Sequence, residues 1–310
     1  MITSKTLPTY RTLTSHKAEL DKDQQKLLKT YFPKGITYVG MMINLVFKLS
    51  VNLAARLTMF MFSISISKPL KENDIAFYSN GRQRKFKQGS YKFNVYEYGQ
   101  GPKVLLVHGW TCSGARWKRY VDEIVSAGYT AIVMDAPGHG TSPGYCLPVP
   151  EYILCVEEVI NFYDGLHSMI THSMGSLVAA VALSRSNHSE DNISLVIMNS
   201  FADCDSLISR FAKCIGIADE VMEHTREWIT NYTYAPLKYF SMVDHFENIN
   251  AQILYIADKQ DIVVPPVEVT KILSSSKSIN FLQTTGLGHR LRSDDVISSV
   301  LDHIDTPLVQ

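Results

Sequence analysis

Three residues that lie far apart in the sequence have types that suit nucleophilic catalysis: Ser173, Asp261 and His289. A hydrolytic serine needs a base that accepts its proton and an acid that orients the base. Asp261 lies in DKQDIVVPP after the expected strand AQILYIAD, and His289 lies in GLGHR after the expected strand INFLQTT. One known triad arrangement has the chain order serine, acid, histidine. The pattern therefore predicts Ser173 as nucleophile, His289 as base and Asp261 as orienting acid.

The residues around Ser173 indicate a sharp strand-to-helix turn, because in THSMGS an apolar run passes into a helical pattern. Such a turn exposes the serine hydroxyl above the sheet edge, beside the amide-rich start of the helix. It needs small residues two positions before and two positions after the serine. Gly175 meets the second requirement, whereas Thr171 occupies the first position. The motif therefore departs from G-x-S-x-G at one residue.

A second turn is predicted at HGWTCSG, residues 108–114, directly after the apolar run KVLLV. Its glycine allows the backbone to turn back on itself. Backbone amides aimed at the reacting carbonyl oxygen stabilise the negative charge that develops there. We expect the amides of Trp110 and Met174 to supply this oxyanion hole.

Other polar residues compete for these roles. Asp203, Asp205 and Asp258 are alternative acids, and Asp203 follows the preceding strand. Cys112 lacks a nearby base, and His139 in the loop DAPGHGTS is expected to be structural. That loop lacks the glycine patterns of phosphate-binding loops, and no Cys, His and acidic cluster has metal-ligand spacing. We therefore expect neither a cofactor nor a metal.

Strand-like runs alternate with helical patterns along most of the chain. The expected strands span residues 84–87, 91–99, 103–109, 130–135, 166–173, 193–200, 251–258 and 279–286. Strands that alternate with helices of this length predict a mostly parallel sheet covered by helices on both faces. Residues 203–247 interrupt the alternation with helical spacing alone. We interpret them as a short helical cap, because ligands of open α/β sheets bind at the carboxyl ends of the strands.

The segments HGW, DAPGHGTS, THSMGS, DIVVPP and GLGHR together resemble the signatures of the α/β-hydrolase superfamily. The resemblance covers about residues 85–310. Within the superfamily, the chain is similar to small bacterial esterase-like and lysophospholipase-like serine hydrolases, which have a short cap and an apolar N-terminal lead-in. The resemblance implies the α/β-hydrolase fold and the same site: Ser173, Asp261 and His289, with Trp110 and Met174 as the oxyanion hole.

The resemblance also narrows the reaction. Relatives that open epoxides or displace halide use an aspartate nucleophile, whereas this chain has Ser173 at the turn. The expected substrate bond is therefore an ester, thioester or amide. The leading hypothesis is an enzyme that cleaves carboxylic esters, including lipid-like ones, through an acyl-serine intermediate. The alternatives are a non-catalytic ligand-binding protein of the same fold, and acyl transfer or C–C bond hydrolysis with the same triad.

Composition excludes several other classes of protein. The 310 residues are 45% hydrophobic and 19% charged, which is enough apolar material for a sizeable core and argues against disorder. The formal net charge is zero, which argues against a nucleic-acid partner. Five cysteines without a C-x-x-C pair fit a reducing compartment. We expect a cytoplasmic protein that acts on a small-molecule acyl ester.

The charge is nevertheless unevenly distributed. Residues 1–96 carry 16 Lys and Arg against 5 Asp and Glu, whereas residues 97–310 carry 14 against 25. No short apolar core with a cleavage site, typical of a secretory signal, occurs at the start. We divide the chain into a basic and apolar N-terminal extension, residues 1–70, and a hydrolase domain, residues 71–310.

Residues 36–66 form the apolar part of this extension. On a single helix, Asn44, Lys48, Asn52 and Arg56 fall four apart and form one narrow polar stripe. The wide apolar remainder must be buried somewhere. There are three alternatives for its burial. The segment lies on an anionic, inner-membrane surface, or it packs on the protein itself or on a second copy, or it spans the bilayer. The basic flanks favour the anionic surface.

Overall fold

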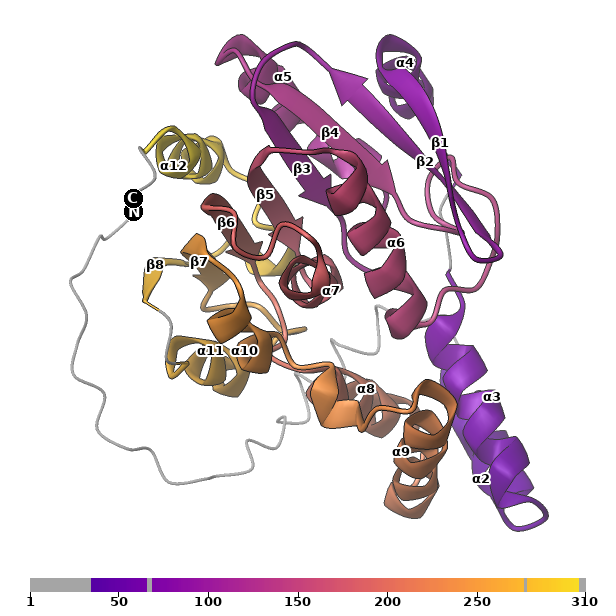
Figure 1. Cartoon of the computed structure of the whole chain (residues 1–310). Coiled ribbons are helices and arrows are strands. Elements are labelled where there is room, and N and C mark those ends of the chain that lie inside the picture. Colours follow the sequence, from indigo (N-terminus) through magenta and orange to yellow (C-terminus); the bar gives the residue numbers. More distant parts are fainter. Residues whose placement is uncertain (1–34, 66–68, 276–277, 307–310) are drawn as a thin grey trace.

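The computed structural model describes residues 35–65, 69–275 and 278–306. Its centre is one eight-stranded sheet with the order β1-β2-β4-β3-β5-β6-β7-β8 (Figure 1). The strands are β1 Arg82–Gln88, β2 Tyr91–Tyr98, β3 Lys103–Val107, β4 Thr130–Asp135, β5 Leu166–His172, β6 Ile193–Met198, β7 Ala251–Asp258 and β8 Ile279–Thr284. Strand β2 pairs antiparallel with both of its neighbours, and the remaining pairs are parallel. The predicted mostly parallel sheet is confirmed.

Helices cover both faces of the sheet, as predicted. The covering helices are α4 Glu72–Asn80, α5 Lys118–Ser126, α6 Val149–Phe162, α7 Met174–Arg185, α11 Pro266–Leu273 and α12 Asp294–Asp305. Alternate residues of β3 enter different cores: Leu105 joins the core under α6 and α7, and Leu106 joins the core under α5 and α12. Because successive side chains of a strand point to opposite faces, a strand buried on both sides is apolar throughout.

The segment between β6 and β7 contains α8 Cys204–Ile215, α9 Asp219–Thr233, α10 Met242–His245 and two short 3-10 turns, Leu237–Tyr239 and Phe246–Asn248. In α8, the Asp203 carboxylate caps the first turn by accepting a hydrogen bond from the Ser206 amide. Gly216 ends this helix in the left-handed conformation that glycine adopts easily. The Arg210 side chain of α8 donates a hydrogen bond of 2.8 Å to the Ile262 carbonyl. Helix α8 therefore borders the loop that carries Asp261.

The N-terminal segment differs from the prediction of one helix. It forms two helices, α2 Ile36–Phe47 and α3 Val51–Ser63. The chain turns at residues 48–50, where extended Ser50 caps α3 through its hydroxyl, which accepts a hydrogen bond from the Leu53 amide. A serine before an apolar helical run is a common helix start. The predicted polar stripe across this turn is therefore wrong.

This hairpin packs against the helices between β6 and β7, with α2 beside α8 and α3 beside α9 (Figure 1). The Asn44 side chain donates to the Gly216 carbonyl at 2.8 Å and accepts from the Ala218 amide at 3.0 Å. A Cβ on Gly40 would lie 2.1 Å from the Ile215 carbonyl oxygen, so the two helices approach at a position that only glycine fits. None of the helices among the described residues is long and apolar enough to cross a membrane.

Candidate active site

Ser173, His289 and Asp261 lie together in the structure, joined by hydrogen bonds. The Nδ1 atom of His289 is 2.8 Å from a carboxylate oxygen of Asp261, and its Nε2 atom is 3.1 Å from the Ser173 hydroxyl. A carboxylate only accepts hydrogen bonds, so the proton sits on Nδ1 and Nε2 accepts from the serine. This tautomer leaves Nε2 free to take the hydroxyl proton.

Ser173 occupies the turn between β5 and α7 with a strained backbone, φ 55° and ψ −132°. Non-glycine residues rarely adopt positive φ, and such strain persists only where the surroundings hold it. The Ser173 amide donates to the Met198 carbonyl at 2.9 Å, and the Ser173 carbonyl accepts from the Ser200 hydroxyl at 3.0 Å. A Cβ on Gly175 would lie 2.4 Å from the His108 carbonyl oxygen. The small residue expected after the serine is therefore required.

Thr171, which stands where glycine is usual, fits without conflict. It is fully buried, and its hydroxyl donates to the Val196 carbonyl of β6 at 2.7 Å. The same oxygen lies 2.9 Å from the Ser176 hydroxyl, which donates to it because the threonine proton is already used. The threonine therefore links β5, β6 and α7 beneath the turn.

The structure separates Asp261 from the alternative acids. The second carboxylate oxygen of Asp261 accepts from the amides of Val263 and Val264, at 2.7 and 3.1 Å. By contrast, Asp203 caps α8 and pairs with Lys271, and Asp205 pairs with Arg226.

Asp258 is engaged with Thr284 and the Leu287 amide. Hydrogen bonds with these partners hold the pKa of Asp258 below its usual value against the opposing effect of burial, which is the largest single influence. Of the four aspartates considered, Asp261 is therefore the one bonded to His289.

The loop after β3 contacts the serine turn directly. A Cβ on Gly109 would lie 2.8 Å from the Ser173 Cβ atom, so Trp110 follows a residue in contact with the serine. The His108 ring orders this loop, because Nδ1 donates to the Gly109 carbonyl and Nε2 accepts from the Ala136 amide. Burial lowers the pKa of His108 to about 4, so the ring is neutral near pH 7. Within the described part of the chain, neither the Trp110 nor the Met174 amide donates a hydrogen bond to protein.

Three side chains that sequence reasoning missed hold the His289 loop. Asn199, His172 and Arg116 donate to the consecutive carbonyls of residues 288, 289 and 290, at 3.0, 2.7 and 3.3 Å respectively. His172 ends β5 and Asn199 directly follows β6, whereas Arg116 lies in the 3-10 turn Gly114–Trp117. The loop is therefore anchored to two neighbouring strand ends and to this turn. Burial holds the pKa of His172 well below its usual value, so its neutral ring donates through Nε2. The position of His172 directly before Ser173 was the available sequence signal.

Two other polar residues of the predicted loops, Asp135 and His139, have structural roles. Asp135 is fully buried and accepts hydrogen bonds from the Gly114 and Thr141 amides and the Tyr78 hydroxyl. His139 is buried, and burial lowers its pKa to about 3. Among the residues that the structure describes, no three His, Cys, Asp or Glu side chains form a group that could hold a metal ion.

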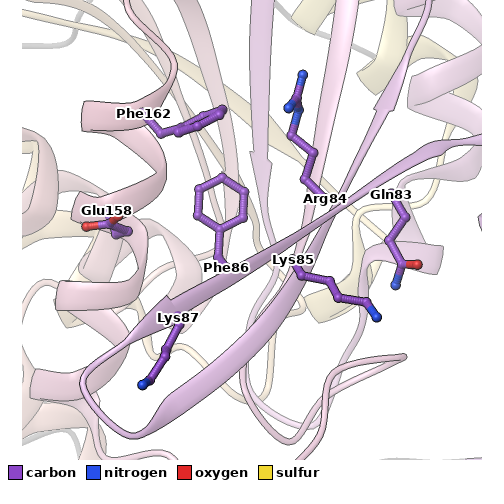
Figure 2. Close-up of a pocket in the computed structure, with 7 residues that line it drawn as sticks. All are labelled: Gln83, Arg84, Lys85, Phe86, Lys87, Glu158 and Phe162. Atoms are coloured by element: carbon purple, nitrogen blue, oxygen red, sulfur yellow. The ribbon is translucent and has the colours of Figure 1, made fainter.

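A groove of about 450 Å³ lies on the edge strand β1 beside α6, apart from this site (Figure 2). It is lined by Gln83, Arg84, Lys85, Phe86, Lys87, Glu158 and Phe162. The Arg84 guanidinium lies 5.5 Å from the centre of the Phe162 ring and forms an ion pair with Glu97. Charged residues on an edge strand discourage pairing with other chains. None of the predicted site residues lines this groove.

The fold and the serine at the strand-to-helix turn define the α/β-hydrolase class. Residues 104–273, more than half of the chain, match the Alpha/beta hydrolase family, and the protein belongs to this family. The resemblance found in the sequence is thereby confirmed.

Relatives of known activity match parts of the chain. Pimeloyl-[acyl-carrier protein] methyl ester esterase of Aeromonas hydrophila is 35% identical over 113 residues, 34% of this chain and 41% of that protein. An epoxide hydrolase of Caballeronia sordidicola is 39% identical over 77 residues, 25% of this chain and 20% of that protein. The chain thus spans about two fifths or less of these two relatives.

Solved structures agree in fold over most of the chain. Esterase Pf2001 of Pyrococcus furiosus has a TM-score of 0.57 at 18% identity and covers 78% of this chain and 96% of its own. The thioesterase domain from the curacin biosynthetic pathway has a TM-score of 0.53 at 14% identity, covering 73% of this chain and 99% of its own. At these identities the likeness concerns the fold alone.

Proposed function

We propose that this hydrolase cleaves carboxylic esters through an acyl-serine intermediate on Ser173. The observation that carries the proposal is the hydrogen-bonded series from Ser173 through His289 to Asp261. His289 Nε2 takes the hydroxyl proton while the serine oxygen attacks the ester carbonyl carbon. Asp261 keeps the other ring nitrogen protonated and stabilises the imidazolium that forms.

The tetrahedral intermediate carries a negative oxygen, which the amides of Trp110 and Met174 are proposed to bind. Both amides border the serine turn, and neither is used within the described chain. Removing one such donor in related chemistry costs about 10²–10³ in rate. His289 then gives its proton to the leaving alcohol as the C–O bond breaks, and the acyl group stays on Ser173.

Water completes the reaction by attacking the acyl-serine, with His289 again moving the proton and the Ser173 oxygen now leaving. His289 takes a proton from water, the resulting hydroxide attacks the acyl carbon, and the proton returns to the Ser173 oxygen as the acid departs. The product pair is one carboxylic acid and one alcohol, so no co-reactant besides water is needed.

We also propose that residues 71–310 form the hydrolase domain and that residues 203–247 act as its cap and select the acyl group. Helix α8 is bonded to the Asp261 loop through Arg210, and Phe211 of α8 packs 6.3 Å from the Phe201 ring, centre to centre. Phe201 follows Ser200, whose hydroxyl contacts the serine turn. Phe201 is buried in the core, whereas Phe211 is partly exposed, and an apolar ring at this position suits an apolar acyl chain, and hence a lipid-like ester.

The test combines labelling with an ester panel. A fluorophosphonate probe should label the wild-type protein and leave Ser173→Ala unlabelled, which separates an enzyme from a non-catalytic binding protein. Nitrophenyl esters of graded acyl length should show turnover with one preferred length, and Phe211→Ala should shift that length. Analysis of the products separates hydrolysis from acyl transfer and from C–C cleavage. Absence of labelling in the folded wild-type protein would refute the proposal.

A further inference from the structure

The helical hairpin α2–α3 exposes an unusual amount of apolar surface. Of the seventeen large apolar side chains that are exposed in the described part of the chain, ten lie between Tyr38 and Phe60. Scattered exposed apolar residues are normal, but a contiguous patch on a soluble protein usually marks an interaction site. The hairpin is therefore the strongest candidate for a binding surface.

Most of the exposed residues form one stripe on each helix. On α2 they are Tyr38, Met41, Met42 and Leu45, and on α3 they are Leu53, Leu57 and Phe60, while exposed Val39 and Val51 lie outside these stripes. This spacing places each set along one face of its helix. The opposite faces already pack inside the protein, through Ile43, Asn44, Ala54 and Thr58. The outward stripes therefore stay exposed even though the hairpin packs on α8 and α9.

The turn of the hairpin is the most exposed part of this surface. Figure 1 shows α2 and α3 side by side, projecting beyond the sheet, with their connecting turn at the outer end. Leu49 in this turn is 86% exposed, more than any other apolar residue between Tyr38 and Phe60. A leucine at the tip of a projecting hairpin can enter an apolar phase without any rearrangement of the fold.

The charged residues of the hairpin indicate which kind of partner its apolar surface binds. Lys48 beside the tip and Arg56 on α3 are its charged residues; both are exposed, and neither forms an ion pair with a described residue. No acidic residue occurs in the sequence between Asp23 and Glu72. On α9, which packs against α3, Glu223 contacts Arg226 and Glu227 contacts His224, while Asp219 and Glu220 in the first turn are exposed. An apolar surface flanked by unpaired cations suits lipid acyl chains under anionic headgroups.

We propose that the outward face of α2 and α3 docks this protein on an anionic phospholipid bilayer. Leu49 and Leu53 enter the acyl region, and Lys48 and Arg56 contact the headgroup phosphates. The protein lies on the bilayer surface through this hairpin. Docking does not depend on the proposed ester hydrolysis, because no residue of the hairpin belongs to the site around Ser173.

The experiment is vesicle flotation of the full-length protein. Vesicles contain phosphatidylcholine alone or phosphatidylcholine with phosphatidylglycerol, at low and high salt. We expect flotation with the anionic vesicles at low salt and a clear reduction at high salt, because exposed charges are screened. Ser173→Ala should float as the wild type does, which separates docking from catalysis.

Single substitutions test the surface itself. Leu49→Glu and Leu53→Glu should each lower the partition coefficient about tenfold or more, since each removes a leucine that docking buries among the lipid acyl chains. Lys48→Gln should lower it about fivefold, the effect of one lysine near an anionic surface. The matched control is Ile75→Glu, which changes an apolar residue on α4 that is 54% exposed and should leave flotation unchanged.

Four results would overturn the proposal. They are absence of flotation, equal binding to neutral and anionic vesicles, equal effects of Leu49→Glu and Ile75→Glu, and a dimer in solution that Leu49→Glu dissociates. The last result would assign the surface to a second copy of the chain. Thermal unfolding of each variant ensures that a loss of flotation is not a loss of fold.

Discussion

Replacing Asp261 by asparagine should reverse the tautomer of His289. One oxygen of the Asp261 carboxylate accepts from the Val263 and Val264 amides, and the other accepts from His289 Nδ1. In Asp261→Asn the single remaining oxygen must stay with the two amides, so the NH₂ group faces Nδ1. Nδ1 then becomes the acceptor, the proton moves to Nε2, and Nε2 can no longer take the Ser173 proton.

The expected loss in kcat is about 10³–10⁴-fold, the size that this tautomer change has in a serine protease triad. In free energy this is about 4–5.5 kcal/mol of transition-state stabilisation. The fold should persist, because both bonds to the amides are retained.

The matched control is Asp203→Asn, at the other acid that follows a strand. Asparagine caps a helix as well as aspartate does, so the bond to the Ser206 amide survives. The ion pair with the partly exposed Lys271 is lost, which costs about 1 kcal/mol of stability or less. Activity should stay within about twofold of wild type if this stability is retained.

The assay is turnover of a nitrophenyl ester, with circular dichroism as the check of folding. Equal losses in the two variants, or a greater loss in Asp203→Asn, would refute the assignment of the acid. A folded Asp261→Asn protein with activity close to wild type would refute the tautomer argument itself.

Three further predictions concern the serine turn and the buried histidines. Ser173→Ala should fold normally and lose ester hydrolysis, measured by turnover and thermal unfolding; retention of more than about a hundredth of the rate would exclude an acyl-serine route. Gly175→Ala should lower stability by about 1–3 kcal/mol in urea unfolding, because the added Cβ meets the His108 carbonyl; an unchanged midpoint would contradict this. His108 and His139, whose pKa values fall to about 4 and 3, bind protons only in the unfolded chain between about pH 6.5 and 4. The free energy of unfolding should therefore fall by about 2 kcal/mol per histidine from pH 7 to 5, and a flat pH profile would be inconsistent with neutral buried rings.

Much of the fold could be predicted because local patterns are sufficient for it. A strand buried on both faces is a short apolar run, as in β3, β4 and β6, and the alternation of strands with helices predicted a mostly parallel sheet. The break between α2 and α3 was not predicted. Lys48, Leu49 and Ser50 are compatible with a continuing helix, and the turn forms where both helices pack on α8 and α9.

The sequence by itself determined the membership of the family and the candidate residues Ser173, Asp261 and His289, because each lies in a short motif at a strand end. Only the tertiary structure decided which acid reaches the histidine, since that depends on loop conformations set by distant amides. It also decided that Thr171 fits, because its hydroxyl finds the Val196 carbonyl on a neighbouring strand. Only the tertiary structure revealed the hydrogen bonds that hold the His289 loop, which come from Asn199, His172 and Arg116. Their partners are about ninety or more positions apart, and such bonds leave no periodic pattern in the sequence.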